Sequence, residues 1–465
     1  MGWAALLCVL GSEGLGAAIV DPQPTLFLRL LTPISTRDSR PGSGFAATVT
    51  RPFLVDGAAA VPVGAQVYGT VLESRGVGLG LKRERARLSL RFDEVTLPNG
   101  DRLTLKAALA GFDNAREDLD RAGRVKGIRA TNELSERMNI RLGGVRLTPF
   151  RLAYRSMIRT FPFQAGGVWL ASSLIFGIPD PEIHYPAGSD FELRLTEPWS
   201  HEARFEDYRG ERPVSLTAEE GQEFWQRQPR LSYLEKNGAE GDPVNLVLVG
   251  PPARAFEAAG WHGADQRLRR NCFRAMRAAA TSSPYARGPM TTLLLDDRRP
   301  DAEWQKGLNT YAKRHHLRVW RAEGNWDGQD AWLVAATHDT GLTVKGLRVT
   351  HDVDRRLDRE RERVVADLML TGCVDSVHHI ASERVGSRTW VTDGRVAVVH
   401  LNACAAPRAA PTSGPPTSRS AGWRLLQRIT LNARNTLLRE NNIYRGYDFV
   451  RNVVQWRKRN ADLTE

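Results

Sequence analysis

Residues 85–109, RARLSLRFDEVTLPNGDRLTLKAAL, decide the fold of the first half of the chain. Apolar and polar residues alternate on both sides of the LPNGD segment, with the period of strands that have one buried face. Asn99 and Gly100 lie between the two alternating runs, and this pair favours a tight two-residue turn. The stretch therefore predicts a β-hairpin.

Similar short runs, bounded by Gly, Pro and Asp, continue from about residue 25 to residue 198. TLFLRLLTP (25–33) is echoed by FELRLTEP (191–198), which predicts that the first and last strands of one sheet share a sequence. We expect residues 22–199 to form an all-β domain, barrel-like or sandwich-like. The charged segment 113–144 is expected to be an excursion with helical pieces such as NELSERMN.

The second half of the chain mixes helical and strand patterns. NLVLVG (245–250) predicts a strand, and PPARAFEAAGW predicts a helix with Pro in its first turn. HLRVWRA and AWLVAATHD predict paired strands, and DRERERVVADLMLTG predicts a helix that stops at Gly372. We expect residues 243–404 to form an α+β domain with a mixed sheet and packed helices. Residues 200–242 are predicted to be a linker with some helix, 405–420 a Pro/Ser/Ala linker, and 421–465 a basic helical tail.

The charge balance favours anionic partners. The chain of 465 residues carries a formal net charge of +12, and from residue 405 onward eleven basic residues face four acidic ones. Such a tail has affinity for an anionic membrane surface or envelope component. Leu426, Ile429, Ala433 and Leu437 recur there at helical spacing, so the tail is either an amphipathic helix on a membrane or a helix that docks on its own domain. Nucleic-acid binding is not expected, because no known nucleic-acid-binding fold is recognisable.

The start of the chain favours export. Residues 1–18 resemble the second half of a secretory signal segment, which predicts a mature N-terminus near Ile19 and a periplasmic or membrane-associated protein. The other apolar run, residues 166–179, is shorter than the ~20 residues that cross a bilayer, so no membrane span is expected in the mature chain. The four cysteines show no C-x-x-C spacing, and Cys373 could pair with Cys404.

Several motifs of the second half resemble the LssY-like C-terminal domain family over residues ~243–400. They are NLVLVGPPARAFEAAGW, Gln305–Lys306, RHHLRVW, WLVAATHD and TH…LDRER…VADLMLTG. The positions that fall on the family pattern are Arg314, His315, His316, Trp320, Thr337, Asp339, His351, Asp358, Glu360 and Arg361. A second histidine and a proline of that pattern are replaced here by Asp352 and Arg355. The resemblance implies a fold and no established reaction. The β-rich first half weakly resembles the β domains of TrbI-type envelope proteins.

The histidines supply the candidate site. His315 and His316 lie side by side on a predicted strand, so their side chains point to opposite faces and only one can meet His351. Imidazole and carboxylate together suit zinc or manganese, which makes His315, His316, His351 and Asp358 candidate metal ligands. We expect one ring of the pair to lie near His351 and near a carboxylate of Asp352, Asp354, Asp358 or Glu360. The alternatives are a structural hydrogen-bond cluster and a site for an acidic ligand.

Two neighbouring charged residues are candidates for catalysis. Glu360 is a candidate general base and Arg361 a candidate anion clamp. Pairing of Asp358 with Arg361 across one helical turn would explain the same charges without any activity. Two functions therefore compete: a non-catalytic binding or scaffold role at the membrane surface, and a metal-assisted hydrolase of a phosphorylated or lipid-linked substrate. No cofactor is expected beyond this divalent metal.

Overall fold

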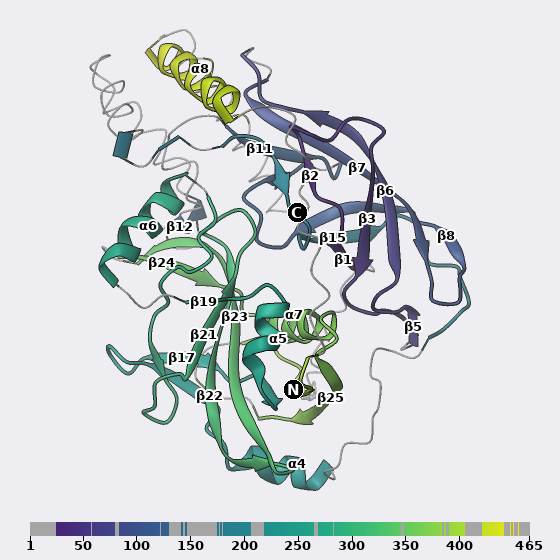
Figure 1. Cartoon of the computed structure of the whole chain (residues 1–465), viewed down its shortest axis with the longest axis vertical. Helices are drawn as coiled ribbons and strands as arrows, with labels where there is room; N and C mark the ends of the chain where they lie inside the picture. The colour runs from purple at the N-terminus through teal and green to yellow at the C-terminus, as the bar shows by residue number, and fades with distance from the viewer. Residues whose placement is uncertain are drawn as a thin grey trace, which may run out of the picture.

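A computed structural model gives the fold (Figure 1). It describes residues 25–56, 58–79, 83–120, 122–129, 141–142, 145–146, 174–175, 177–178, 180–205, 218–264, 268–281, 283–345, 348–383, 386, 390–404, 421–440, 447, 450 and 454. The expected signal segment 1–18, the NELSERMN helix and the linker 405–420 lie outside the described residues.

The first domain is built on one nine-stranded antiparallel sheet that curls into a near-barrel. Its strand order is β10-β11-β7-β6-β3-β1-β15-β9, with β8 paired to β7. The strands are β1 (Thr25–Leu30), β3 (Gly44–Val49), β6 (Gln66–Arg75), β7 (Arg85–Thr96), β8 (Arg102–Thr104), β9 (Ala107–Phe112), β10 (Asp118–Leu119), β11 (Val125–Arg129) and β15 (Asp190–Leu195). Two small antiparallel pairs join β2 (Ile34–Ser35) to β14 (His184–Tyr185) and β4 (Phe53–Val55) to β5 (Ala58–Val61).

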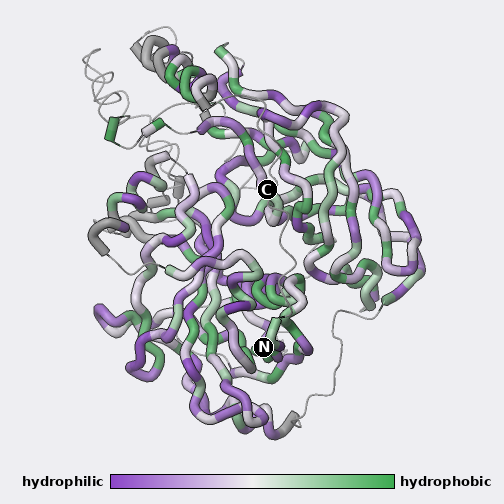
Figure 2. Tube along the Cα trace, in the orientation of Figure 1, coloured by the Kyte–Doolittle hydropathy of each residue, from purple (hydrophilic) through white to green (hydrophobic). Residues whose placement is uncertain are grey.

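The predicted hairpin is confirmed as β7 and β8. Its turn is closed by the Leu97 N–H, which donates to the Asp101 carbonyl at 2.9 Å. Gly100 has a φ of 90°, a backbone conformation that favours glycine. Alternate residues of β7 are buried, as the sequence pattern requires. Figure 2 shows the same alternation of hydrophobic and hydrophilic residues along the strands of this domain.

The echoed sequences lie next to each other. β1 pairs antiparallel with β15, so that Leu28 is opposite Phe191 and Arg29 is opposite Asp190. The two strands that open and close the first sheet are thus neighbours, and their buried leucines belong to one core. This contact between distant parts of the chain closes the domain.

The second domain contains a ten-stranded mixed sheet. Its order is β19-β21-β22-β23-β18-β26-β25, and β24 and β12 both pair with β23. β18 runs parallel to β26, and β12 runs parallel to β23. The strands are β12 (Arg141–Leu142), β13 (Val145–Arg146), β18 (Leu246–Val249), β19 (His262–Gly263), β21 (Ala302–Lys306), β22 (Arg314–Trp326), β23 (Gln329–Lys345), β24 (Arg348–Val353), β25 (Val374–Ala381) and β26 (Arg395–Leu401). β16 (Leu231–Leu234), β17 (Glu240–Pro243) and β20 (Leu293–Leu294) form a separate small sheet.

Helices cover both faces of this sheet. Leu246 and Leu248 of β18 face α5 (Pro252–Ala258) and α7 (Leu357–Met369), whereas Val247 and Val249 face α4 (Ala218–Gln226). All four side chains are buried, because a central strand covered on both faces has no polar side. α6 (Leu268–Thr281) completes the domain. The predicted fold class, an all-β domain followed by an α+β domain, is confirmed.

α7 ends as the sequence predicts, with Gly372 in a positive-φ conformation (75°) three residues after the helix. On the same side of the sheet, Cys373 forms a disulfide with Cys404. α7 lies on the side of the second domain that faces β1 and β15 (Figure 1). It therefore supplies several of the side chains that meet the first domain.

The basic tail contains α8 (Ala421–Glu440), which lies against the first domain (Figure 1). Leu431 is buried in the core of that domain, Arg428 pairs with Asp180 at 2.9 Å, and Arg434 donates to the carbonyls of Gly78 and Leu79. Among the described residues, none of the helices has the length and apolar character needed to span a bilayer.

Candidate functional site

The two adjacent histidines of β22 lie on opposite faces of the sheet, as their neighbouring positions require. β22 pairs antiparallel with β23, which places His315 opposite His338 and His316 opposite Thr337. His315 is on the face covered by α7, and His316 is on the other face. The two rings therefore belong to two different clusters.

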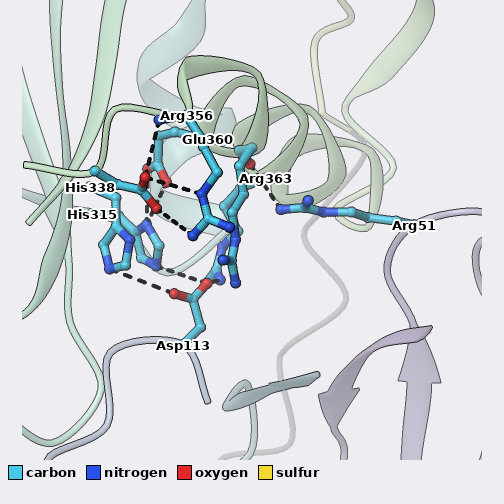
Figure 3. Close-up of a pocket in the computed structure, with 9 residues that line it drawn as sticks. Arg51, Asp113, His315, His338, Arg356, Glu360 and Arg363 are labelled. Atoms are coloured by element: carbon cyan, nitrogen blue, oxygen red, sulfur yellow. Dashed lines mark hydrogen bonds and ion pairs between the residues drawn. The ribbon is translucent and has the colours of Figure 1, made fainter. Parts of the chain in front are cut away.

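His315 lies between two carboxylates (Figure 3). Its Nδ1 is 2.7 Å from Glu360 of α7, and its Nε2 is 3.1 Å from Asp113, which follows β9 of the first domain. The Nε2 contact is an ion pair and not a well-directed hydrogen bond. The His315 side chain is 1% exposed, so these contacts are shielded from water.

The protonation state of His315 follows from this geometry. Burial alone would lower the pKa of the imidazole, but the charges of Asp113 and Glu360 outweigh it and raise the pKa to about 9. Burial would raise the carboxyl pKa values of Asp113 and Glu360, yet their cationic neighbours hold both below the ordinary range. At neutral pH the group is an imidazolium between two carboxylates.

His338 of β23 stacks on His315, with ring centroids 4.5 Å apart. Its Nε2 lies 2.7 Å from the Asn114 side-chain oxygen and 3.7 Å from Asp113. Burial, and then the charge of His315, lower its pKa, so this ring is neutral and donates to Asn114. One ligand atom from each of Asp113, His315 and His338 lies within 4.8 Å of the other two. Among the described residues, this group has the spacing to hold a metal ion.

Arginines surround this cluster. The pocket that contains it is lined by Arg51, Asp113, His315, His338, Asp354, Arg356, Arg359, Glu360 and Arg363. Arg363 of α7 is paired with Asp113, the carboxylate that a metal would require. A divalent cation placed here would meet four guanidinium groups, which oppose it electrostatically. The charge distribution disfavours a metal, although the spacing of the three ligand atoms would allow one.

The other face of the sheet holds His316 and His351. His316 Nε2 is 3.1 Å from Asp339, and His351 Nδ1 is 3.8 Å from the other oxygen of the same carboxylate. Arg314 also binds Asp339, at 3.0 Å. Burial lowers the pKa of His351 to about 4. The contacts of Asp339 with His316, His351 and Arg314 hold the pKa of its carboxyl far below the usual range despite burial. This buried ion-pair cluster anchors β24 to the sheet.

Arg361 and Asp358 meet neither histidine cluster through any contact of the described residues. Arg361 donates to Asp393 at 2.8 Å and to Asp358 at 3.2 Å, and Asp358 also accepts from the Asp393 backbone N–H. These bonds join the start of α7 to the chain segment before β26. The i,i+3 pairing considered from the sequence is present.

The structure thus divides the candidate residues into three places. It brings His315 to Glu360, it brings His316 and His351 to Asp339, and it leaves Asp358 with Arg361. Neither ring of the histidine pair meets both His351 and a carboxylate of residues 352–360, because the strand sends them to opposite faces. Sequence reasoning missed Asp113 and His338. The register of β22 and β23 would have found His338, but no local pattern marks Asp113.

A second ion-pair network joins the domains next to His315. Asp367 of α7, fully buried, accepts from Arg29 of β1, from the Lys306 ammonium at 2.8 Å and from the Trp261 indole N–H at 2.8 Å. Asp190 of β15 binds Arg29 at 2.8 Å and extends the network into the first domain. Burial lowers the pKa of Lys306 to about 8, which Asp367 only partly offsets. Charged side chains therefore fill the contact between the domains.

Comparisons with known proteins show a family similarity in the second domain. Residues 225–396 match the family model described as LssY C-terminus, which confirms the resemblance predicted for the second half and extends it back into α4. Among solved structures, ComB10 of the Com type IV secretion system of Helicobacter pylori matches with 14% identity and a TM-score of 0.20. That match covers 39% of this chain and 90% of ComB10; at this TM-score it supports no conclusion about fold or role. The search of curated proteins gives no significant match.

Proposed function

We propose that this chain, whose residues 225–396 match the LssY C-terminus family, is an exported, non-catalytic binding or scaffold protein of the cell envelope that works at a membrane surface. One observation carries the non-catalytic part. Both ring nitrogens of His315 face carboxylates, one from each domain, so the most reactive candidate group serves as a charged clamp between domains. A general base or a metal ligand needs a free nitrogen lone pair, and an imidazolium has none.

The surface of α8 supports the membrane part. Leu431 faces the first domain, whereas Trp423, Leu425, Leu426 and Ile429 are 49–57% exposed. At about 100° per residue, Leu425, Leu426 and Ile429 lie on the side of the helix opposite Leu431, and Trp423 lies on its flank. An exposed apolar face on a basic segment is typical of helices that lie in a membrane interface. The two interpretations of the tail are therefore compatible, because one face of α8 docks and the other is available to lipid.

The disulfide supports export. Cys373 and Cys404 are joined across a loop of 31 residues, and such bonds form and persist mainly in oxidising compartments. The same argument favours a periplasmic or membrane-associated location over the cytoplasm.

Vesicle binding of the full chain tests the membrane role. We expect co-sedimentation with phosphatidylglycerol-containing vesicles that weakens as salt rises. Replacing Leu425 and Ile429 together by glutamate should reduce partitioning of the chain into the vesicles by about tenfold or more, because two apolar side chains that would be buried in the lipid are lost. Leu72→Glu, at a position 47% exposed on β6, is the matched control and should leave binding unchanged. Equal binding by the double variant and the control would refute membrane docking through α8.

Metal-assisted hydrolysis of a phosphorylated or lipid-linked substrate is the second candidate. It is favoured by Asp113, His315 and His338, whose ligand atoms lie within 4.8 Å of one another. Glu360 contacts Nδ1 of His315, the ring nitrogen that would not bind the metal, as carboxylates do in many zinc sites. Elemental analysis of the purified protein distinguishes the two candidates. Stoichiometric zinc or manganese that His338→Ala removes would replace the scaffold proposal, and a metal-free protein that binds none on titration would eliminate the hydrolase.

A further inference from the structure

The arginine-lined pocket lies between the two domains. It encloses about 210 Å³, counting its open mouth, and it adjoins a second hollow of about 320 Å³. The two share Arg51, Asp113, Arg359 and Arg363. The first domain contributes Arg51 and Asp113, and β22, β23, the connection between β24 and α7, and α7 itself contribute the rest (Figure 3). The site exists only when the two domains are in contact.

Arg51 differs from the other arginines of the pocket. Arg356 pairs with Asp354 at 3.0 Å, Arg359 pairs with Glu192, and Arg363 pairs with Asp113 and Asp190. Arg51 instead donates to the Arg359 backbone carbonyl at 2.9 Å and lies 4.3 Å over the Phe27 ring. Within the described part of the chain, no carboxylate forms a salt bridge with it. Its guanidinium is left with hydrogen-bond donors to offer.

The lining of the pocket is rich in arginine. Its four arginines and the protonated His315 face three carboxylates in the lining, Asp113, Asp354 and Glu360, while Glu192 and Asp190 of the adjoining hollow pair with Arg359 and Arg363. Burial, together with repulsion from Arg359 and Arg363, lowers the pKa of Arg51 to about 10. A buried guanidinium that forms no salt bridge is costly unless an anion compensates its charge.

We propose that this pocket binds a phosphate group, held by Arg51 with Arg356 and Arg359. Arg51 forms no salt bridge within the described residues, and guanidinium groups bind phosphate oxygens in a bidentate manner. The Arg51 guanidinium is already oriented by Phe27 and by the Arg359 carbonyl, so little side-chain freedom is lost on binding. The phosphate group would lie at the open mouth of the pocket, where Arg356 is exposed, and the rest of a phosphorylated molecule would remain outside. The inference concerns residues other than those of α8 and does not depend on the proposed membrane docking.

Calorimetric titration of the full chain with inorganic phosphate is the first test. We expect saturable binding at one site, weakened about tenfold or more in Arg51→Gln and less in Arg51→Lys, which keeps the charge but loses the planar fork. Arg299→Gln, at an exposed arginine that pairs with Glu235, is the matched control and should bind as the parent chain does. Arg356→Gln, at an exposed position, repeats the test should Arg51→Gln not fold. The proposal would be overturned if the parent chain bound no phosphate in either this assay or the vesicle assay below. It would also be overturned if the Arg51 and Arg299 variants bound phosphate equally, or if the parent chain bound chloride as well as phosphate.

Vesicles distinguish the source of the phosphate. In a background carrying glutamate at Leu425 and Ile429, so that α8 does not contribute, the chain is mixed with vesicles containing phosphatidic acid or phosphatidylcholine alone. Arg51-dependent binding to phosphatidic acid would identify a lipid headgroup as the ligand. Binding of inorganic phosphate without binding to either vesicle would identify a soluble phosphorylated ligand. Vesicle binding that Arg51→Gln leaves unchanged, with no calorimetric phosphate site, would count against the pocket.

Discussion

Replacing His315 with glutamine should destabilise the fold in a way that depends on pH. His315 carries its positive charge between Asp113 and Glu360, and its pKa is raised from 6.5 to about 9. Glutamine has a similar size and can still donate one hydrogen bond, but it brings no charge. The substitution therefore removes the imidazolium while leaving most of the packing in place.

The magnitude follows from linkage between protonation and folding. A rise in pKa from 6.5 to about 9 corresponds to about 3 kcal/mol of stability. Because the folded-state pKa is raised, this contribution is complete below pH 6.5 and is lost as the pH rises through 9. The parent chain should exceed His315→Gln by about 3 kcal/mol at pH 6, and the difference should shrink steadily towards pH 10.

Urea unfolding at pH 6, 8 and 10, followed by tryptophan fluorescence, measures this difference. Other titrating groups act on both proteins and largely cancel in the comparison. His201→Gln is the control, because His201 is a partly exposed histidine that lies 3.4 Å from Asp101 at the surface. It should cost less than about 0.5 kcal/mol at every pH. A His315→Gln effect that is the same at pH 6 and pH 10 would show a neutral His315 and refute the charged clamp.

Three other substitutions test the fold. Asp367→Asn removes the buried charge that three cations share and should lower the free energy of unfolding in urea by about 3 kcal/mol. The same change at the exposed Asp330 should lower it by less than about 1 kcal/mol, and similar values for the two variants would contradict the interdomain network. Replacing Cys373 and Cys404 by serine should lower the unfolding free energy by about 3–4 kcal/mol, as expected for a loop of 31 residues, and a stability that is insensitive to reductant would exclude the disulfide. Gly69→Ala would place a Cβ 2.5 Å from a backbone carbonyl of the adjacent strand, so thermal unfolding should show a loss of about 2 kcal/mol, and an unchanged midpoint would contradict this packing.

Much of the fold was predictable because it depends on local periodicity. The alternation in residues 85–109 predicted β7 and β8, and the all-apolar NLVLVG predicted β18, a strand covered on both faces. The echo between residues 25–33 and 191–198 even indicated which distant strands belong together, since β1 and β15 are neighbours. The segment 200–242 holds more regular structure than the predicted linker with some helix suggested, because α4, β16 and β17 are packed against the second domain.

The candidate site was predictable only in part. Opposite orientations of His315 and His316 follow from strand geometry alone, and the acidic start of α7 explains how Glu360 comes to face one of them. The partner of the other ring was not predicted, because Asp339 lies on β23 and reaches His316 through the register between two strands. Register is decided by the packing of whole strands and by turn geometry, and single residues do not reveal it.

Sequence patterns alone were enough to predict most helices and strands, the resemblance of the second half to the LssY-like family and the residue types available for chemistry, since each depends on spacings of a few residues. The contact of Asp113 with His315, about two hundred residues further along the chain, follows from the tertiary structure alone, as does the position of Arg51, which forms no salt bridge with a carboxylate of the described residues. Pairing between distant charges depends on how two complete domains approach each other. The long-range contact that makes His315 a cation has no period in the sequence. It arises only when β9 of the first domain and α7 of the second have folded against one another.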